Sequence, residues 1–222
     1  MLKLHRMKKL FSIFALVIMF SSLSCKKDKT PAATTDIEGA QSNMGTVGTL
    51  VHGSTLTAVG VTGLVASVVS LSNGVSSYSG SCAVTNPVIK NILSNIPGIT
   101  ITGDSVKATG FEFKSTVEGV QSYVGLAPGI LVKYASEVGD TYPVGSTGRV
   151  RTVISKSTTD DYFWDYMLIK VMEIEEPTSG LKSLGVNKIT YVANHKFGLV
   201  GIQFNFTDGT SAKFQVYTSS TN

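Results

Sequence analysis

The sequence predicts a mainly β protein, either an antiparallel β-sandwich or a strongly curved sheet with one or two short helices. The firmest evidence is a β-hairpin signal, in which apolar residues alternate on both sides of Asp208-Gly209. Short runs rich in β-branched and aromatic residues recur through the second half of the chain, at the spacing of consecutive strands. The clearest helix signal covers residues 86–95.

Residues 39–89 form an unusual stretch that contains no Asp, Glu, Lys or Arg. Glycines separate short β-branched runs here, which favours strands and tight turns. Within residues 58–72, however, apolar residues also fall at helical spacing, and Asn73-Gly74 suits the end of a helix. Both strand and helix therefore remain open for residues 58–72. Because glycines and hydroxyls interrupt the apolar run, burial in the domain or under a partner explains it better than a transmembrane helix.

A short helix is expected over residues 86–95. Asn86 is a suitable N-cap and Pro87 fits the first helical turn. The apolar residues that follow make one face of the helix, which should end before Pro97-Gly98.

From residue 99 onward the pattern is that of β-strands. Gly103-Asp104 is a turn signal between residues 99–101 and 105–108, and residues 111–114 alternate as in a half-buried strand. Further candidate strands cover residues 130–134, 149–154, 167–174, 189–192, 200–206 and 212–216.

The first 24 residues predict a cleaved export signal. Basic residues at positions 3, 6, 8 and 9 precede an eleven-residue apolar run over 10–20, in which only Ser12 is polar. A membrane-spanning helix needs roughly 20 apolar residues, so this run fits the core of a signal peptide instead.

The residues after this signal resemble a known class of start. Ser24-Cys25-Lys26-Lys27-Asp28 is similar to the beginning of bacterial lipoproteins, especially those of Bacteroidota. The resemblance covers residues 1–30 and implies a diacylglycerol on the Cys25 sulfur, an acylated N-terminus and a stable membrane anchor. Because Lys26 is not the Asp that marks inner-membrane retention in well-studied lipoproteins, the resemblance implies the outer membrane, facing either the periplasm or the medium. Ser22 departs from the commonest lipoprotein signal, which has Leu there, and Ser22 with Ser24 also suits the peptidase that releases soluble proteins.

After the signal, residues 25–44 predict a lipidated cysteine with a flexible tether, and residues 45–222 predict a single β-rich domain. Four of the 19 Lys and Arg residues precede Cys25, which leaves 15 against 15 Asp and Glu. A neutral mature chain lacks the positive charge that nucleic-acid binding requires. With Cys25 acylated, Cys82 is a lone thiol, interpreted as a small buried side chain rather than a nucleophile. Neither a metal nor another cofactor is expected, because no zinc-ligand spacing occurs.

One cluster is the main candidate for ligand binding. Residues 160–166 hold three carboxylates and four aromatic rings in seven positions, and the candidate ligand-binding residues are Asp161, Tyr162, Trp164, Asp165 and Tyr166. Such a cluster can form an aromatic platform for sugar rings, or it can bind calcium through its carboxylates. The third interpretation is a polar turn at the start of a strand whose aromatic residues pack in the core.

Two other segments have weaker claims. His195 lies in a strand–turn–strand context without a recognisable nucleophile, so catalysis is not expected of it. Residues 191–200 and the hairpin that follows loosely resemble curved-sheet periplasmic lipid-carrier proteins, without a motif specific enough to transfer residue roles. Glu173, Glu175 and Glu176 could supply one carboxylate of a glycosidase pair, but acidic residues at a strand end are ordinarily solvated.

These patterns predict a lipid-anchored envelope lipoprotein that is not an enzyme but a binding or structural module. The expected partners are the membrane, through the anchor, and a glycan, a lipid or another envelope protein. A carrier of an apolar ligand is the main alternative, and a glycan hydrolase is the third. A carrier should contain a continuous apolar cavity, a surface binder should expose aromatic rings beside acidic residues, and a hydrolase should place two carboxylates across a cleft.

Overall fold

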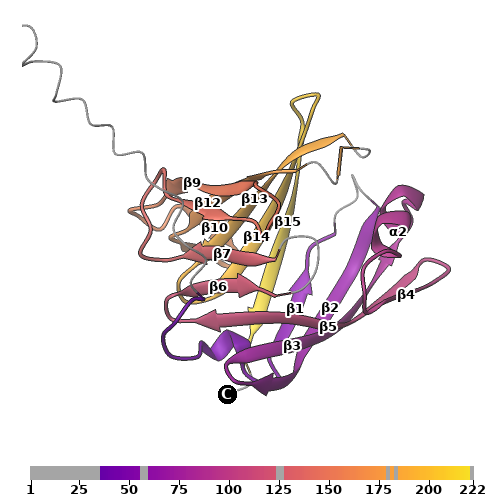
Figure 1. Ribbon diagram of the computed structural model, residues 1–222, viewed down its shortest axis with the longest axis horizontal. Helices are drawn as coiled ribbons and strands as arrows, with labels where there is room; N and C mark the ends of the chain where they lie inside the picture. The colour runs from indigo at the N-terminus through magenta and orange to yellow at the C-terminus, as the bar shows by residue number, and fades with distance from the viewer. Residues whose placement is uncertain (1–35, 56–59, 124–127, 179–180, 183–184, 221–222) are drawn as a thin grey trace, which may run out of the picture. The chain divides into compact units, whose positions relative to one another are not determined.

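The computed structural model describes residues 36–55, 60–123, 128–178, 181–182 and 185–220. Within these residues, thirteen strands form one antiparallel sheet, and two further strands form a separate hairpin (Figure 1). The prediction of a mainly β protein with a strongly curved sheet is therefore confirmed. The strands are β1 Leu50–Gly53, β2 Val61–Ser72, β3 Val75–Val84, β4 Ile99–Thr102, β5 Ser105–Thr116, β6 Gly119–Ser122, β7 Gly129–Lys133, β8 Thr141–Pro143, β9 Val150–Lys156, β10 Tyr162–Trp164, β11 Met167–Ile169, β12 Met172–Pro177, β13 Val186–Asn194, β14 Gly198–Phe206 and β15 Ser211–Ser219. The helical elements are the 3-10 turn η1 Asn43–Gly45 and the helix α2 Pro87–Leu93.

The sheet curves until its two edges almost meet. Its strand order is β7-β6-β5-β3-β2-β1-β15-β14-β13-β12-β9-β8, with β4 paired to β5, so the first strand, β1, pairs with the last strand, β15. The edge strands β7 and β8 contact each other, and one side chain from β8 and one from β9 bond to the backbone of β7. The Lys133 amide donates to the Tyr142 hydroxyl at 3.3 Å, and Arg151 Nη1 donates to the Ile130 carbonyl oxygen at 2.7 Å.

This junction contains a buried ion pair. Arg151 and Glu176 are almost completely buried, with Arg151 Nε at 2.9 Å from Glu176 Oε2. The same carboxylate accepts from the Tyr191 hydroxyl at 3.1 Å and from Arg149 Nη1 at 3.1 Å. Every oxygen of the buried carboxylate therefore has a charged or polar donor, as burial of a charge requires. The prediction that the 173–176 carboxylates are solvated is wrong for Glu176.

The open question about residues 58–72 resolves as strand, since β2 covers Val61–Ser72, while residues 58–59 lie outside the described part of the chain. Asn73 and Gly74 have φ of 51° and 76°. Two consecutive residues with positive φ form the two-residue turn that joins antiparallel strands. Asn73-Gly74 is therefore the tip of the β2–β3 hairpin and not the end of a helix.

Other local signals are confirmed. Asn86 caps α2, since its Oδ1 accepts from the amides of Val88 at 2.9 Å and Ile89 at 3.3 Å. Gly103 turns the chain between β4 and β5, and Asp208-Gly209 turns it between β14 and β15. The single strand predicted over residues 167–174 is wrong: β11 pairs with β10, whereas β12 pairs with β9 and β13.

The packed domain begins earlier than the sequence predicts. Ile37 is 1% exposed and its amide donates to Gln121 Oε1 at 2.9 Å, while Gln121 Nε2 donates to Asp36 at 2.7 Å. An apolar side chain inside an otherwise polar stretch thus inserts into the core. Residues 36–44 belong to the domain rather than to a tether, whereas the predicted signal and Cys25 lie outside the described residues. Among the residues that are described, no helix is both long and apolar enough to cross a bilayer.

Candidate functional site

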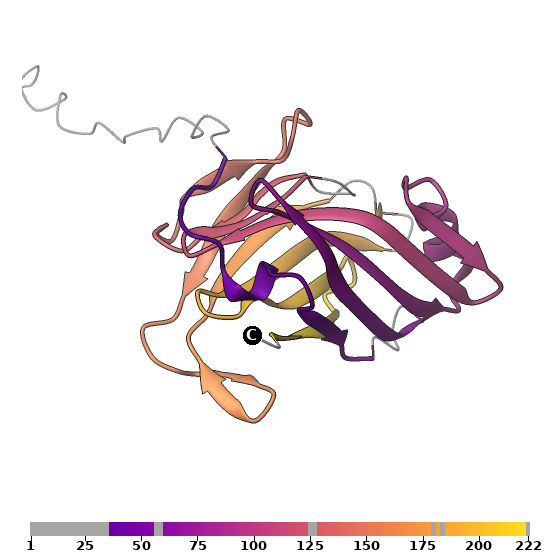
Figure 2. The same ribbon diagram turned by 90° about the horizontal axis from the view of Figure 1, so that it is seen from below.

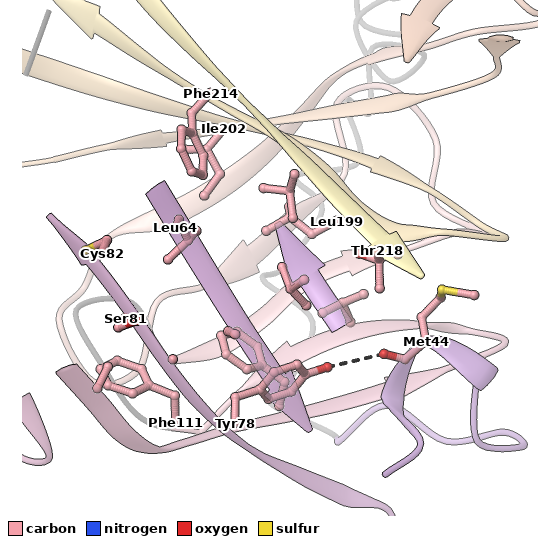
Figure 3. Close-up of a pocket in the computed structure, with 18 of the residues that line it drawn as sticks. Met44, Leu64, Tyr78, Ser81, Cys82, Phe111, Leu199, Ile202, Phe214 and Thr218 are labelled. Atoms are coloured by element: carbon pink, nitrogen blue, oxygen red, sulfur yellow. Dashed lines mark hydrogen bonds between the residues drawn. The ribbon is translucent and has the colours of Figure 1, made fainter. Parts of the chain in front are cut away.

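The concave side of the curved sheet forms an apolar cavity of about 520 Å³ that is partly open to the surroundings (Figure 3). One wall comes from the first half of the chain and the other from the C-terminal strands, which β1 and β15 bring together. Leu64, Tyr78, Cys82, Phe111 and Phe113 line the first wall. Leu199, Ile202, Phe214, Val216 and Thr218 line the second.

The cavity exists because a row of small residues crosses the first wall. Ala66 on β2 pairs with Gly80 on β3, and Gly80 pairs with Ala108 on β5. All three line the cavity. A Cβ atom at Gly80 would lie 2.6 Å from the Cβ of Ala66 and 2.7 Å from the Val65 carbonyl oxygen, so no larger residue fits there without movement of the backbone. The small row leaves unfilled a space that larger side chains occupy in an ordinary core.

The walls are apolar and incompletely covered. Leu64, Phe113, Leu199 and Ile202 face the cavity, yet each is only half-buried. In the part of the chain that the structure describes, no charged side chain lines the cavity. A site of this size, mostly apolar with a few polar groups, is typical of a small-molecule site, for which volumes of about 300–1,000 Å³ are usual.

The few polar groups in the lining are neutral. The Tyr78 hydroxyl donates to the Met44 carbonyl oxygen at 3.3 Å (Figure 3), and burial raises the pKa of Tyr78 to about 12. Burial also raises the pKa of the Cys82 thiol. Both groups therefore stay protonated at neutral pH. Cys82 is a free, half-buried thiol in the cavity wall, so it is less buried than the sequence interpretation expects.

Elements outside the two walls also contribute to the lining. They supply Leu93 of α2, Ile99 of β4, Met44 of η1 and Phe197 of the turn between β13 and β14. Asn194 Oδ1 shapes this turn by accepting from the amides of Lys196 at 2.8 Å and Phe197 at 3.1 Å. The neighbouring His195 is an exposed turn residue.

The predicted ligand platform is divided between the two faces of the β10–β11 hairpin. Tyr162 and Trp164 point into the core, and Trp164 is only 4% exposed. The Trp164 indole N–H donates to the Val216 carbonyl oxygen at 2.8 Å, and its ring packs 4.5 Å from that of Phe197, between centroids. Trp164 therefore does not present a surface, and the interpretation of these aromatic residues as core residues is the correct one for Tyr162 and Trp164.

The remaining predicted site residues are exposed but do not converge. Tyr166 is 92% exposed at the tip of the hairpin, beside Asp165, which has a φ of 53°. Asp161 accepts from the Ser157 hydroxyl at 2.7 Å. Within the described ranges, no group of three or more acidic, histidine or cysteine side chains is placed to hold a metal ion.

Sequence reasoning did not identify the cavity, although one signal for it was visible. The uncharged stretch 39–89 supplies η1, β1, β2 and β3, which form much of the first wall. Its absence of charge is the property that an apolar cavity wall requires. Comparison of the chain with family models, curated proteins and solved structures yielded no match.

Proposed function

We propose that this protein is an envelope lipoprotein, anchored through Cys25, whose domain binds one apolar molecule inside its curved sheet. The observation that carries the proposal is the cavity of about 520 Å³, whose described lining contains no charged residue. An apolar-ligand carrier is the main alternative that the sequence offers, and the apolar cavity supports it better than the buried Trp164 supports a surface aromatic platform. The binding of the ligand is non-covalent and involves no catalysis.

The free energy for binding comes from covering the walls. Each Å² of apolar surface removed from water contributes about 25 cal/mol, and the half-buried side chains of both walls offer such surface. A hydrocarbon chain or a compact apolar ring system would cover them without leaving a buried charge unpaired. A charged headgroup would lie outside the walls, because the described lining offers no counter-ion.

A matched pair of variants tests this proposal. Ala66 faces the cavity, whereas the next residue of β2, Ser67, is not part of the lining and belongs to the opposite face by strand alternation. Ala66→Phe should fill the cavity and abolish binding, while Ser67→Phe adds the same bulk outside and should leave binding intact. Ala108→Phe is a second cavity-filling variant from another strand.

The intrinsic fluorescence of Trp164 can report ligand binding in this experiment. Trp164 is the sole tryptophan of the sequence, and it packs on Phe197, which lines the cavity. Bromine atoms quench indole fluorescence at short range, so dibromostearate in the cavity should quench Trp164 in a saturable manner. The Cys25→Ser mature chain avoids the need for detergent. Equal quenching of wild type, Ala66→Phe and Ala108→Phe, each with unchanged thermal unfolding, would show that the ligand does not enter the cavity.

The anchor requires its own test. Mass analysis of the N-terminal peptide should show diacylglycerol and an acyl chain on Cys25, and Cys25→Ser should move the protein from the membrane fraction to the soluble fraction. An unmodified Cys25 in the purified mature protein would contradict the anchor but would leave the binding proposal untouched.

A further inference from the structure

A row of residues crosses the first wall of the cavity at right angles to its strands, which lie side by side in Figure 2. The small row Ala66, Gly80 and Ala108 forms the centre of this longer row. Val51 of β1 pairs in register with Ala66, and Ile99 of β4 pairs in register with Ala108. All five residues line the cavity and are half-buried, so the row is part of the surface that a ligand meets.

Larger side chains flank the small row on both sides. Leu64 of β2 and Val106 of β5 lie on one side, each two residues along its strand from a member of the small row. On the other side, Tyr78 of β3 has the same spacing, and Phe111 of β5 pairs with it. All four line the cavity. Residues on one face of a strand repeat about every 7 Å, so the small row is the floor of a groove about one residue wide.

The groove is longer than it is wide. Because neighbouring strands are about 4.8 Å apart, the row from Val51 to Ile99 extends over about 20 Å of the sheet, with the small residues in its middle 10 Å. Val51 and Ile99 are larger and bound the groove at its two ends. Leu199, Ile202 and Phe214 lie on the opposite wall of the cavity (Figure 3). A narrow apolar groove therefore faces a second apolar wall.

Contact with the floor of this groove requires a narrow ligand. An unbranched hydrocarbon chain has the width of one methylene group along its whole length, so it can lie between the flanking side chains and touch Gly80. A fused ring system is several carbon atoms wide and would rest on Leu64 and Tyr78, which leaves a gap above the floor. A gap of about 0.5–1 Å already removes roughly a quarter to a half of the dispersion attraction of a contact.

We propose that the apolar molecule bound by this protein is an unbranched hydrocarbon chain, which lies across β2, β3 and β5 in the groove above Ala66, Gly80 and Ala108. This inference rests on the proposed function, because it names the class of ligand that occupies the same cavity. Free fatty acids and membrane phospholipids both supply such a chain. In either case the head group stays outside, because the described lining contains no charged side chain. The flanking side chains select against sterols and other fused rings.

Two ligands with the same head group test the preference for a chain. Hexadecyl sulfate and cholesteryl sulfate differ only in their apolar part, and each is titrated below its critical micelle concentration into the delipidated Cys25→Ser mature protein. Isothermal titration calorimetry should show that hexadecyl sulfate binds at least about tenfold more tightly. Equal affinities, or tighter binding of cholesteryl sulfate, would overturn the inference and leave the cavity as an apolar site. Failure of both ligands to bind would instead contradict the proposed function.

A matched pair of variants tests whether the chain lies in the groove. Ala108→Val adds two methyl groups to the floor and should weaken the binding of hexadecyl sulfate at least about tenfold. Ala83→Val adds the same two methyl groups to β3 at a position outside the lining and should leave binding unchanged. Ala66→Val is a second narrowing variant, from another strand. Unchanged affinity in folded Ala108→Val and Ala66→Val would show that the chain does not lie in the groove.

The molecule that co-purifies with the protein from its host gives an independent result. Mass analysis of this adduct should show a fatty acid or a phospholipid, and its mass separates these two sources of the chain. A polycyclic molecule in its place would overturn the inference while supporting an apolar binding site.

Discussion

At the scale of single residues, the buried Arg151–Glu176 pair is the most consequential interaction of the domain. Arg151 of β9 donates a hydrogen bond to the Ile130 carbonyl oxygen of β7 and another to the Glu176 carboxylate of β12. Glu176 also accepts a hydrogen bond from the Tyr191 hydroxyl. These bonds hold together the two edges of the sheet, which are not paired by a backbone ladder. The closed curvature that creates the cavity therefore depends on a polar contact at the opposite side of the sheet.

Removal of one partner should be costly. Arg151→Met removes the hydrogen bond and the positive charge that Arg151 offers to the buried Glu176 carboxylate. Removing one partner of a buried ion pair typically lowers the free energy of unfolding by about 3–5 kcal/mol. Lys90→Met is the control, because the side chains of the Lys90–Asp104 pair are 25% and 62% exposed, and a pair at the surface should contribute no more than about 1 kcal/mol. Urea unfolding of both variants measures the difference. A loss below about 1 kcal/mol for Arg151→Met would contradict the structural role given to the pair.

At the scale of elements, the β2–β3 hairpin depends on two residues in the left-handed region. Gly74 has a φ of 76°, and the nearest atom to a Cβ built there lies 3.8 Å away. Gly74→Ala should therefore cost about 1–2 kcal/mol from backbone conformation alone, without a clash. Asn73→Gly should be neutral or slightly stabilising, because glycine adopts the φ of 51° at that position without strain. Thermal unfolding distinguishes them, and a neutral Gly74→Ala would contradict the assigned turn.

The elements also show what can be predicted from the sequence. Asn86, Gly103 and Asp208-Gly209 were interpreted correctly because caps and turns depend on neighbouring residues alone. Asn73-Gly74 was ambiguous, since the same dipeptide suits a helix end or a hairpin. The candidate site is harder to predict from the sequence, because contacts with distant strands decide whether an aromatic side chain points inward or outward. Trp164 packs on Phe197 and Tyr217, and nothing near Trp164 in the sequence indicates those partners.

At the scale of the whole molecule, buried tyrosines should make the fold sensitive to alkali. Burial raises the pKa of Tyr78 and of Tyr162 to about 12, against about 10 in an unfolded chain. The unfolded state thus loses these protons first, so stability is fully present below about pH 10 and falls as the pH rises toward 12. Melting temperatures between about pH 8 and pH 11.5 should decline only above pH 10. Tyr78→Phe should make the decline shallower, and a flat profile would contradict the assigned burial.

At this scale, the proposed binding cavity depends on contacts between distant parts of the chain. The small row Ala66, Gly80 and Ala108 creates the space, and the pairing of β1 with β15 encloses it. Both features join residues that are far apart in the sequence. This is why an uncharged stretch of the chain could indicate burial without indicating a binding site.

Native mass spectrometry of the mature protein, purified from its own host, tests the central claim most directly. A carrier should show a non-covalent adduct of one apolar molecule on the wild-type protein and on Ser67→Phe, and none on the folded Ala66→Phe variant. Extraction and mass analysis of the adduct would then identify the ligand class. A wild-type protein that is free of ligand and also fails to bind dibromostearate would contradict the claim that the curved sheet is a carrier site.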